Sequence, residues 1–367
     1  MNNLSPLISS NNAFDLHSHI DHIRPKLEAW WNHEEQEEPC LIASRLHLDS
    51  AELPAYRDLN QFWTDVDYIL ERQMKIINHT QYYGMAVPFH YVDYGSSALA
   101  CFYGSKPRYM DEVTIWADPG YQKIEEILDV DIDPENGPWK TTLRLLKDST
   151  RLAKNHHMVS LFAFMGMADL LSGLYGTENF LTDLLIKPDL VHRAMNHLKE
   201  SWINTFFQLN KITDQSGNPG SISWPGIWTP GTSFTIQEDT AYMMSPDQFN
   251  EFCLPHICDF VECLDYPFFH LDGIGMIKHV DSLLTISKLK AIQWQPGAGH
   301  EAIDQWTDLI SKILRAGKSV QVYARAKEVE TLVDKVGAKG LLVILTDEKE
   351  EPVKEVMEKY PSNLIYK

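Results

Sequence analysis

Eight short apolar runs, separated by longer amphipathic stretches, are the feature that most limits how this chain of 367 residues can fold. The runs are CLIASR (40–45), YGMAVPFH (83–90), MVSLFAFM (158–165), SISWPGIW (221–228), PFFHLDG (267–273), AIQWQPG (291–297), SVQVYAR (319–325) and GLLVILT (340–346). The stretches between them carry helix signals, such as Ser245 and Gln248 as a capping box around Pro246. Strands that alternate with helices predict an α/β fold, a (β/α)8 TIM barrel with long insertions in its N-terminal half. A doubly wound α/β sheet is the alternative.

The rest of the chain shows no low-complexity tract or linker, so we expect a single domain over residues 1–367, with residues 1–20 flexible. The start MNNLSPLISSNN lacks the basic and apolar regions of a signal peptide, and five cysteines do not form a paired disulfide framework. The apolar stretch 158–176 contains Asp169, which favours a buried strand and helix over a membrane span. These features predict a cytoplasmic protein.

The net charge of −19 limits the class of partner. Its field repels nucleic acids, anionic membranes and substrates with many carboxylates. We therefore expect neither a nucleic-acid nor a membrane partner.

The run PFFHLDG ends in two polar residues that suit chemistry, His270 and Asp272. Side chains two apart on a strand share a face, and active sites of such barrels lie at the C-terminal ends of the strands. The pair could ligate a divalent metal, act as an acid and base, or form a structural hydrogen-bonded pair. Asp347, after the last run, is either a third metal ligand or a helix cap.

Further polar and aromatic residues follow the other runs and are expected at the same mouth. Trp224 and Trp228 in SWPGIWTPGTSFTIQED predict an aromatic wall for an apolar substrate. Glu238 and Asp239 follow. Each is either an exposed loop carboxylate or an active-site residue, and Asp239 is the better active-site candidate of the two. The remaining candidate substrate contacts are His90, Gln293, Trp294 and His300.

Several segments together resemble one known family. MMSPDQFNEFCLP, YPFFHLDGIGMIKHVDSLL, AIQWQPGAG, AGKSVQVYA and KGLLVILT are similar to the uroporphyrinogen decarboxylase superfamily, and most of all to its bacterial branch grouped with cobalamin-dependent methyltransferases. The resemblance spans about residues 20–360 and implies a (β/α)8 barrel over one domain. An arginine motif like that of the true decarboxylases is missing from the N-terminal region, which argues against porphyrinogen decarboxylation.

The resemblance also implies a reaction and a metal site. Methyltransferases of this branch hold zinc through His-x-Cys and a later Cys, and His270, Asp272 and Asp347 stand near those places here. Carboxylates in place of thiolates make a harder site for Zn or another divalent metal. The implied activity is transfer of a methyl group from a small O- or N-methylated compound to a corrinoid, with His270 and Asp272 as catalytic residues.

The corrinoid would be carried by a partner protein, because the chain shows no D-x-H-x-x-G segment of its own. Decarboxylation or another lyase reaction on a small substrate stays open as an alternative, as does a relative without catalysis. A homodimer is left open as well.

Overall fold

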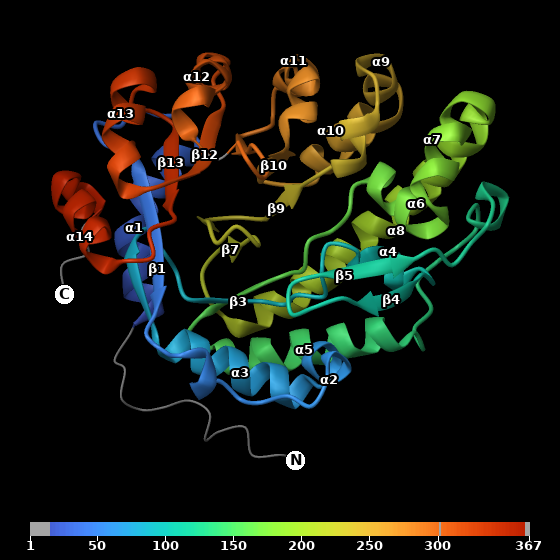
Figure 1. Cartoon of the computed structure of the whole chain (residues 1–367), viewed down its shortest axis with the longest axis horizontal. Helices are drawn as coiled ribbons and strands as arrows, with labels where there is room; N and C mark the ends of the chain where they lie inside the picture. The colour runs from blue at the N-terminus through green and yellow to red at the C-terminus, as the bar shows by residue number, and fades with distance from the viewer. Residues whose placement is uncertain (1–14, 301, 364–367) are drawn as a thin grey trace.

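A seven-stranded sheet lies at the centre of the mixed α/β fold that the computed structural model gives for residues 15–300 and 302–363 (Figure 1). In spatial order its strands are β2 (Thr80–Gly84), β1 (Cys40–Leu46), β13 (Leu341–Leu345), β12 (Ser319–Ala324), β11 (Ala291–Gln295), β10 (Tyr266–Asp272) and β9 (Ser233–Ile236). Neighbours pair in parallel from β1 to β9, and β2 joins the β1 edge antiparallel.

Three two-stranded ladders accompany this sheet. They are β3 (Phe89–Tyr91) with β6 (Met158–Ser160) in parallel, and the antiparallel pairs β4 (Lys106–Tyr109) with β5 (Ile115–Asp118) and β7 (Ser221–Ile222) with β8 (Trp228–Thr229). The described strands therefore pair as an open sheet plus ladders, and this pairing alone does not close the predicted eight-stranded barrel.

Fourteen α-helices accompany the strands in the described residues. They are α1 (Leu16–Trp31), α2 (Leu59–Thr64), α3 (Val66–Asn78), α4 (Ala98–Phe102), α5 (Gly137–Ala153), α6 (Met167–Tyr175), α7 (Thr177–Ile186), α8 (Pro188–Thr213), α9 (Pro246–Gln248), α10 (Leu254–Glu262), α11 (Val280–Leu284), α12 (Thr307–Arg315), α13 (Ala326–Val336) and α14 (Glu350–Lys359). Figure 1 shows α10 to α13 in a row outside strands β9 to β13. Within residues 15–300 and 302–363, no helix has both the length and the apolar character to cross a bilayer.

Three of the eight predicted strands differ from the structure. The run MVSLFAFM is a strand only over β6, which pairs with β3 outside the seven-stranded sheet. The run SISWPGIW is a short hairpin, because the chain reverses at Pro225 and Gly226, where the glycine has φ of +80°. The strand that joins the sheet beside β10 is β9, which was not predicted. The run YGMAVPFH breaks after Gly84, whose φ is +63°, into the end of β2 and the start of β3.

The strands of the sheet have two differently packed faces. Phe269 and Leu271 on β10 belong to the large hydrophobic core under the outer helices, whereas Phe268 belongs to a smaller cluster on the opposite face. On β11, Trp294 likewise faces the large core and Ala291 the smaller cluster. We call the face that carries this smaller cluster the inner face.

Helix α1 packs across the inner face at the N-terminal ends of the strands. Its side chains Trp30 and Trp31 are fully buried, and both rings pack edge-on against Phe268. Asp15 caps the helix by accepting from the backbone N–H groups of His17 and Ser18. Of the segment predicted to be flexible, Asp15 caps α1 and residues 16–20 form its start, and residues 1–14 lie outside the described residues.

Candidate functional site

His270 and Asp272 lie on the inner face, at the C-terminal end of β10. They follow Phe268 at intervals of two, and the parallel register places Gln293 of β11 beside His270. The His270 imidazole is largely buried, whereas the Asp272 carboxylate is partly exposed to solvent. Nε2 of His270 lies 3.8 Å from Oδ2 of Asp272, which is beyond hydrogen-bond distance but within range of an ion pair.

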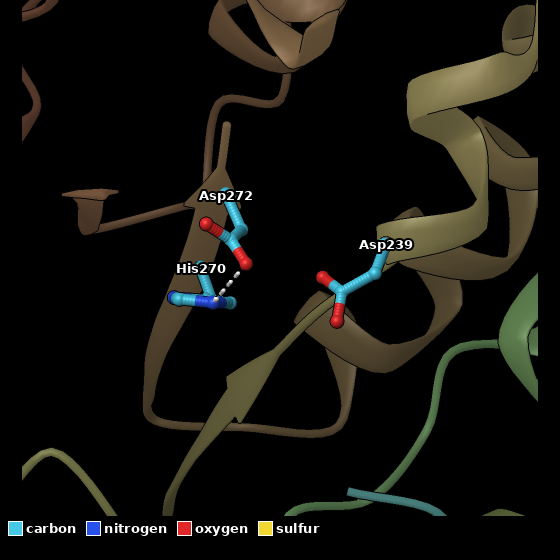
Figure 2. A group of neighbouring side chains, drawn as sticks. All are labelled: Asp239, His270 and Asp272. Carbon is cyan, nitrogen blue, oxygen red and sulfur yellow. Dashed lines mark ion pairs between the residues drawn. The ribbon is translucent and has the colours of Figure 1, made fainter. Parts of the chain in front are cut away.

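Asp239 completes a cluster of three potential ligands. It is the first residue of the 3-10 helix η5 (Asp239–Met243), which follows β9, and Figure 2 shows its carboxylate facing His270 and Asp272 across a gap. One ligand atom from each of the three residues lies within 4.8 Å of the other two. The Asp239 side chain is exposed to solvent, yet many protein atoms surround it, and this burial is the main cause of the rise in its pKa. Both hold for a group that is recessed in a concave surface.

Neighbouring side chains fix the orientation of the His270 ring. Nδ1 donates a hydrogen bond to Oε1 of Gln293, whose amide nitrogen donates to the Tyr323 hydroxyl at 3.2 Å. Because an amide oxygen can only accept, the neutral ring carries its proton on Nδ1, and the Nε2 lone pair faces Asp272. The Trp224 ring meets the imidazole edge-on, with 5.1 Å between centroids.

The protonation of the cluster is shifted by its own charges. Burial and the charge of Asp169 raise the pKa of Asp239 to about 7, although the attraction of His270 opposes them. Burial lowers the pKa of His270, but Asp272 and Asp239 together outweigh it, so the net shift is upward. Near neutral pH the cluster can therefore gain or lose a proton, which suits acid/base work as well as cation binding.

The structure brings together five of the predicted site residues. They are Trp224, Asp239, His270, Asp272 and Gln293. Two residues of the surroundings were missed, namely Tyr323 and Asp169. Tyr323 could have been found from the alternation in SVQVYAR, since it shares a face with Gln321, which pairs with Gln293.

Two predicted tryptophans lie elsewhere, so the aromatic wall reduces to Trp224. Trp294 is fully buried on the outer side of the sheet and packs on Trp306, because it alternates with the inward Gln293. Trp228 is fully buried against α1, where its carbonyl accepts a hydrogen bond from Trp31.

The two predicted histidine contacts also lie outside the cluster. His90 is buried under the outer helix α5, with Nδ1 at 2.7 Å from the Ser149 hydroxyl. His300 lies near Trp306, at 6.3 Å between ring centroids, and Trp306 packs on the outward-facing Trp294. Neither belongs to the group of His270, Asp239 and Asp272.

Asp347 acts as a helix cap and takes no part in the cluster. Its Oδ2 accepts a hydrogen bond of 2.6 Å from the backbone N–H of Ala326, the first residue of α13. Of the two interpretations that the sequence left open, the structure supports the cap, and the third member of the cluster is Asp239.

Comparisons with known proteins show a likeness in fold. No protein-family model matches the chain, and no curated protein sequence matches it either. Among solved structures, a methyltransferase from Methanosarcina mazei is similar, with a TM-score of 0.57 over 95% of this chain and 98% of that one. The two sequences are 12% identical, so the similarity concerns the fold.

Proposed function

We propose that this protein is a methyltransferase that moves a methyl group from a small O- or N-methylated compound to a corrinoid carried by a partner protein. The observation that carries the proposal is the cluster of Asp239, His270 and Asp272 at the C-terminal ends of the strands. The fold likeness to a methyltransferase supports it. With it we propose that the open sheet and the β3–β6 ladder form a variant of the (β/α)8 barrel.

The three residues fit a divalent metal. In a zinc site with bonds of about 2.0–2.2 Å, neighbouring ligand atoms are about 3 to 3.6 Å apart. The distances between the ligand atoms of Asp239, His270 and Asp272 would therefore have to shorten by about 1 Å on metal binding. The Nε2 lone pair of His270 is free, and Gln293 orients the ring through Nδ1, as second-shell partners of metal-bound histidines do. One imidazole and two carboxylates suit Zn or Mn.

The chemistry expected at this site concerns the leaving group. The corrinoid of the partner would supply the nucleophile that accepts the methyl group, and the metal would supply a Lewis acid for the departing oxygen or nitrogen. Without a metal, the protonated His270, with Asp272 at 3.8 Å, would instead donate a proton to that atom through Nε2. Trp224 lies against the imidazole, where it can pack on the apolar part of a substrate and exclude water.

The charge at the site narrows the substrate class. Asp239 and Asp272 face the site, and Asp169 lies close enough to raise the pKa of Asp239. Such a site favours a neutral or cationic compound, such as a methyl ether or a methylamine, over a polycarboxylate.

A methyl-transfer assay with a reduced corrinoid protein tests the proposal. Absorbance of the methylated corrinoid should appear with at least one member of a panel of methyl ethers and methylamines. Replacing His270 with Ala should lower the rate by about 10²-fold or more, the loss expected for a missing general acid.

The matched control is His192→Ala on the outer helix α8, where the ring stacks on Phe252. Its rate should equal that of the parent protein. No absorbance change with any compound, or a His270→Ala variant as fast as the parent, would show the mechanism to be wrong.

A further inference from the structure

Two buried carboxylates lie directly behind Asp239, where η5 meets the start of α6. Glu238 has no exposed surface and Asp169 is 6% exposed. The sequence alone left Glu238 open as an exposed loop carboxylate, and its burial corrects that interpretation. Among the described residues, neither carboxylate forms an ion pair with a lysine or arginine.

Glu238 binds the N-terminal backbone of α6, and Asp169 of α6 binds the N-terminal backbone of η5. Glu238 precedes η5 and accepts from the backbone N–H groups of Met167 at 2.9 Å and Ala168 at 3.1 Å, the first two residues of α6. Asp169, in the first turn of α6, accepts from the N–H groups of Asp239 at 3.0 Å and Thr240 at 2.6 Å. All four carboxylate oxygens are thus used on backbone donors that would otherwise be unpaired.

A glycine leaves the space that these reciprocal hydrogen bonds need. At Gly166, a Cβ atom would lie 2.2 Å from Cδ of Glu238, so only glycine lets the carboxylate reach the start of α6. Thr240 and Ser172 add a hydroxyl contact of 3.2 Å across the same junction. Because η5 has only five residues, its first residue depends on such external bonds for a fixed position.

We propose that Asp169 and Glu238 are positioning residues that hold Asp239 in place opposite His270 and Asp272. The inference rests on the proposed function in taking that cluster as the reactive site. Asp169 acts directly, by binding the backbone N–H of Asp239, and Glu238 acts through α6, which carries Asp169. Both must be carboxylates, because an amide offers one acceptor oxygen where two N–H groups have to be bound.

Metal binding and hydrogen exchange together test the inference. In titrations with Zn²⁺ or Mn²⁺, Asp169→Asn should bind at least about 10-fold more weakly than the parent, the lower range for loss of an outer partner of a metal ligand. Glu238→Gln should weaken binding as well, and it decides the question if Asp169→Asn does not fold. Ser172→Ala, at the same junction but without a bond to Asp239, is the matched control and should bind as the parent does.

The second measurement does not depend on a metal. Hydrogen exchange of the segment that contains Asp239 and Thr240 should be faster in Asp169→Asn than in the parent and in Ser172→Ala. If the parent binds neither metal, the metal part of the proposed function fails, and exchange alone decides the positioning role. Unchanged exchange in Asp169→Asn, or metal affinity equal to that of the parent, overturns the inference.

Discussion

The His270 imidazole contacts a neutral side chain through one ring nitrogen and faces two carboxylates with the other. Gln293 binds Nδ1, while Asp239 and Asp272 face Nε2 and raise the pKa of the ring against the effect of burial. At the proposed metal site, a proton and a metal ion would therefore compete for the same nitrogen, and for the Asp239 carboxylate, whose pKa is about 7. The outcome of that competition would set the affinity for the proposed metal.

We predict that zinc affinity rises with pH through neutrality. Below about pH 7 the Asp239 carboxylate is protonated and cannot ligate, and the raised pKa of His270 favours a proton on Nε2 as well, so a rise in pH frees ligand atoms. Calorimetric titrations at pH 6, 7 and 8, with protein purified without a chelator, measure this affinity and the protons released.

The control for that experiment is Asp347→Asn, which removes the carboxylate that caps α13. Its zinc affinity should match that of the parent at every pH. A parent affinity that stays flat from pH 6 to 8, or a loss of zinc in Asp347→Asn, would contradict the assignment of the three ligands.

At the scale of elements, the junction between β9 and α6 is the most constrained part of the site. Glu238 reaches the start of α6 only because Gly166 has no side chain. This arrangement joins a strand of the C-terminal half to a helix of the N-terminal half. Its stability should therefore depend on one glycine.

We expect Gly166→Ala to destabilise the protein strongly, since the added Cβ would lie 2.2 Å from both Glu238 Cδ and the Gln237 carbonyl oxygen. Displacing the carboxylate leaves buried backbone N–H groups unpaired, at a cost of about 1–3 kcal/mol for each. Thermal unfolding measured by circular dichroism gives the change.

Gly137→Ala provides the comparison, because a Cβ at this first residue of α5 meets nothing within 4 Å. It should unfold at the parent temperature or slightly above it. Equal unfolding temperatures for the two variants would show that Glu238 does not need the space at Gly166.

Elements with a regular pattern could be predicted from the sequence, and those set by tertiary contacts could not. The strands β10 to β13 follow from apolar runs, and alternation correctly placed His270 and Asp272 on one face. By the same alternation, Trp294 next to the inward Gln293 lies on the outer face, although its aromatic ring favours a substrate contact. Strand β9 was missed because SFTI is short and follows two Pro-Gly turns. Asp239 could be named a site residue, yet its meeting with His270 depends on strand order.

Across the whole molecule, several histidines are buried in their neutral form. Burial lowers the pKa of His90 to about 3 and that of His256 to about 4, and it places the pKa of His157 well below the usual range. In the unfolded chain these rings titrate near pH 6.5, so between the two values the unfolded state binds more protons. Each such ring therefore makes the folded state less stable as the pH falls from about 6.5.

Replacing His90 with Asn should reduce this loss of stability in acid. The variant keeps a polar group near the Ser149 hydroxyl, but it has no ring to protonate on unfolding. The parent should lose stability relative to the variant by up to about 1.4 kcal/mol per pH unit between pH 6 and 4. Urea unfolding at several pH values measures the difference.

The same substitution at His47, which is exposed, is the matched control and should leave the pH dependence of the parent unchanged. Parallel curves for the parent and His90→Asn would mean that His90 does not take up a proton on unfolding.

The packing of α1 over the inner face has a kinetic consequence for the proposed reaction. Trp30 and Trp31 fill the N-terminal ends of the strands, which favours approach of a small molecule to His270 from the opposite end. A corrinoid protein would have to approach from that end too, and once seated it would block the entrance. The methyl donor must then enter first and the demethylated product leave last, so the order of binding follows from a helix at the far end of the fold.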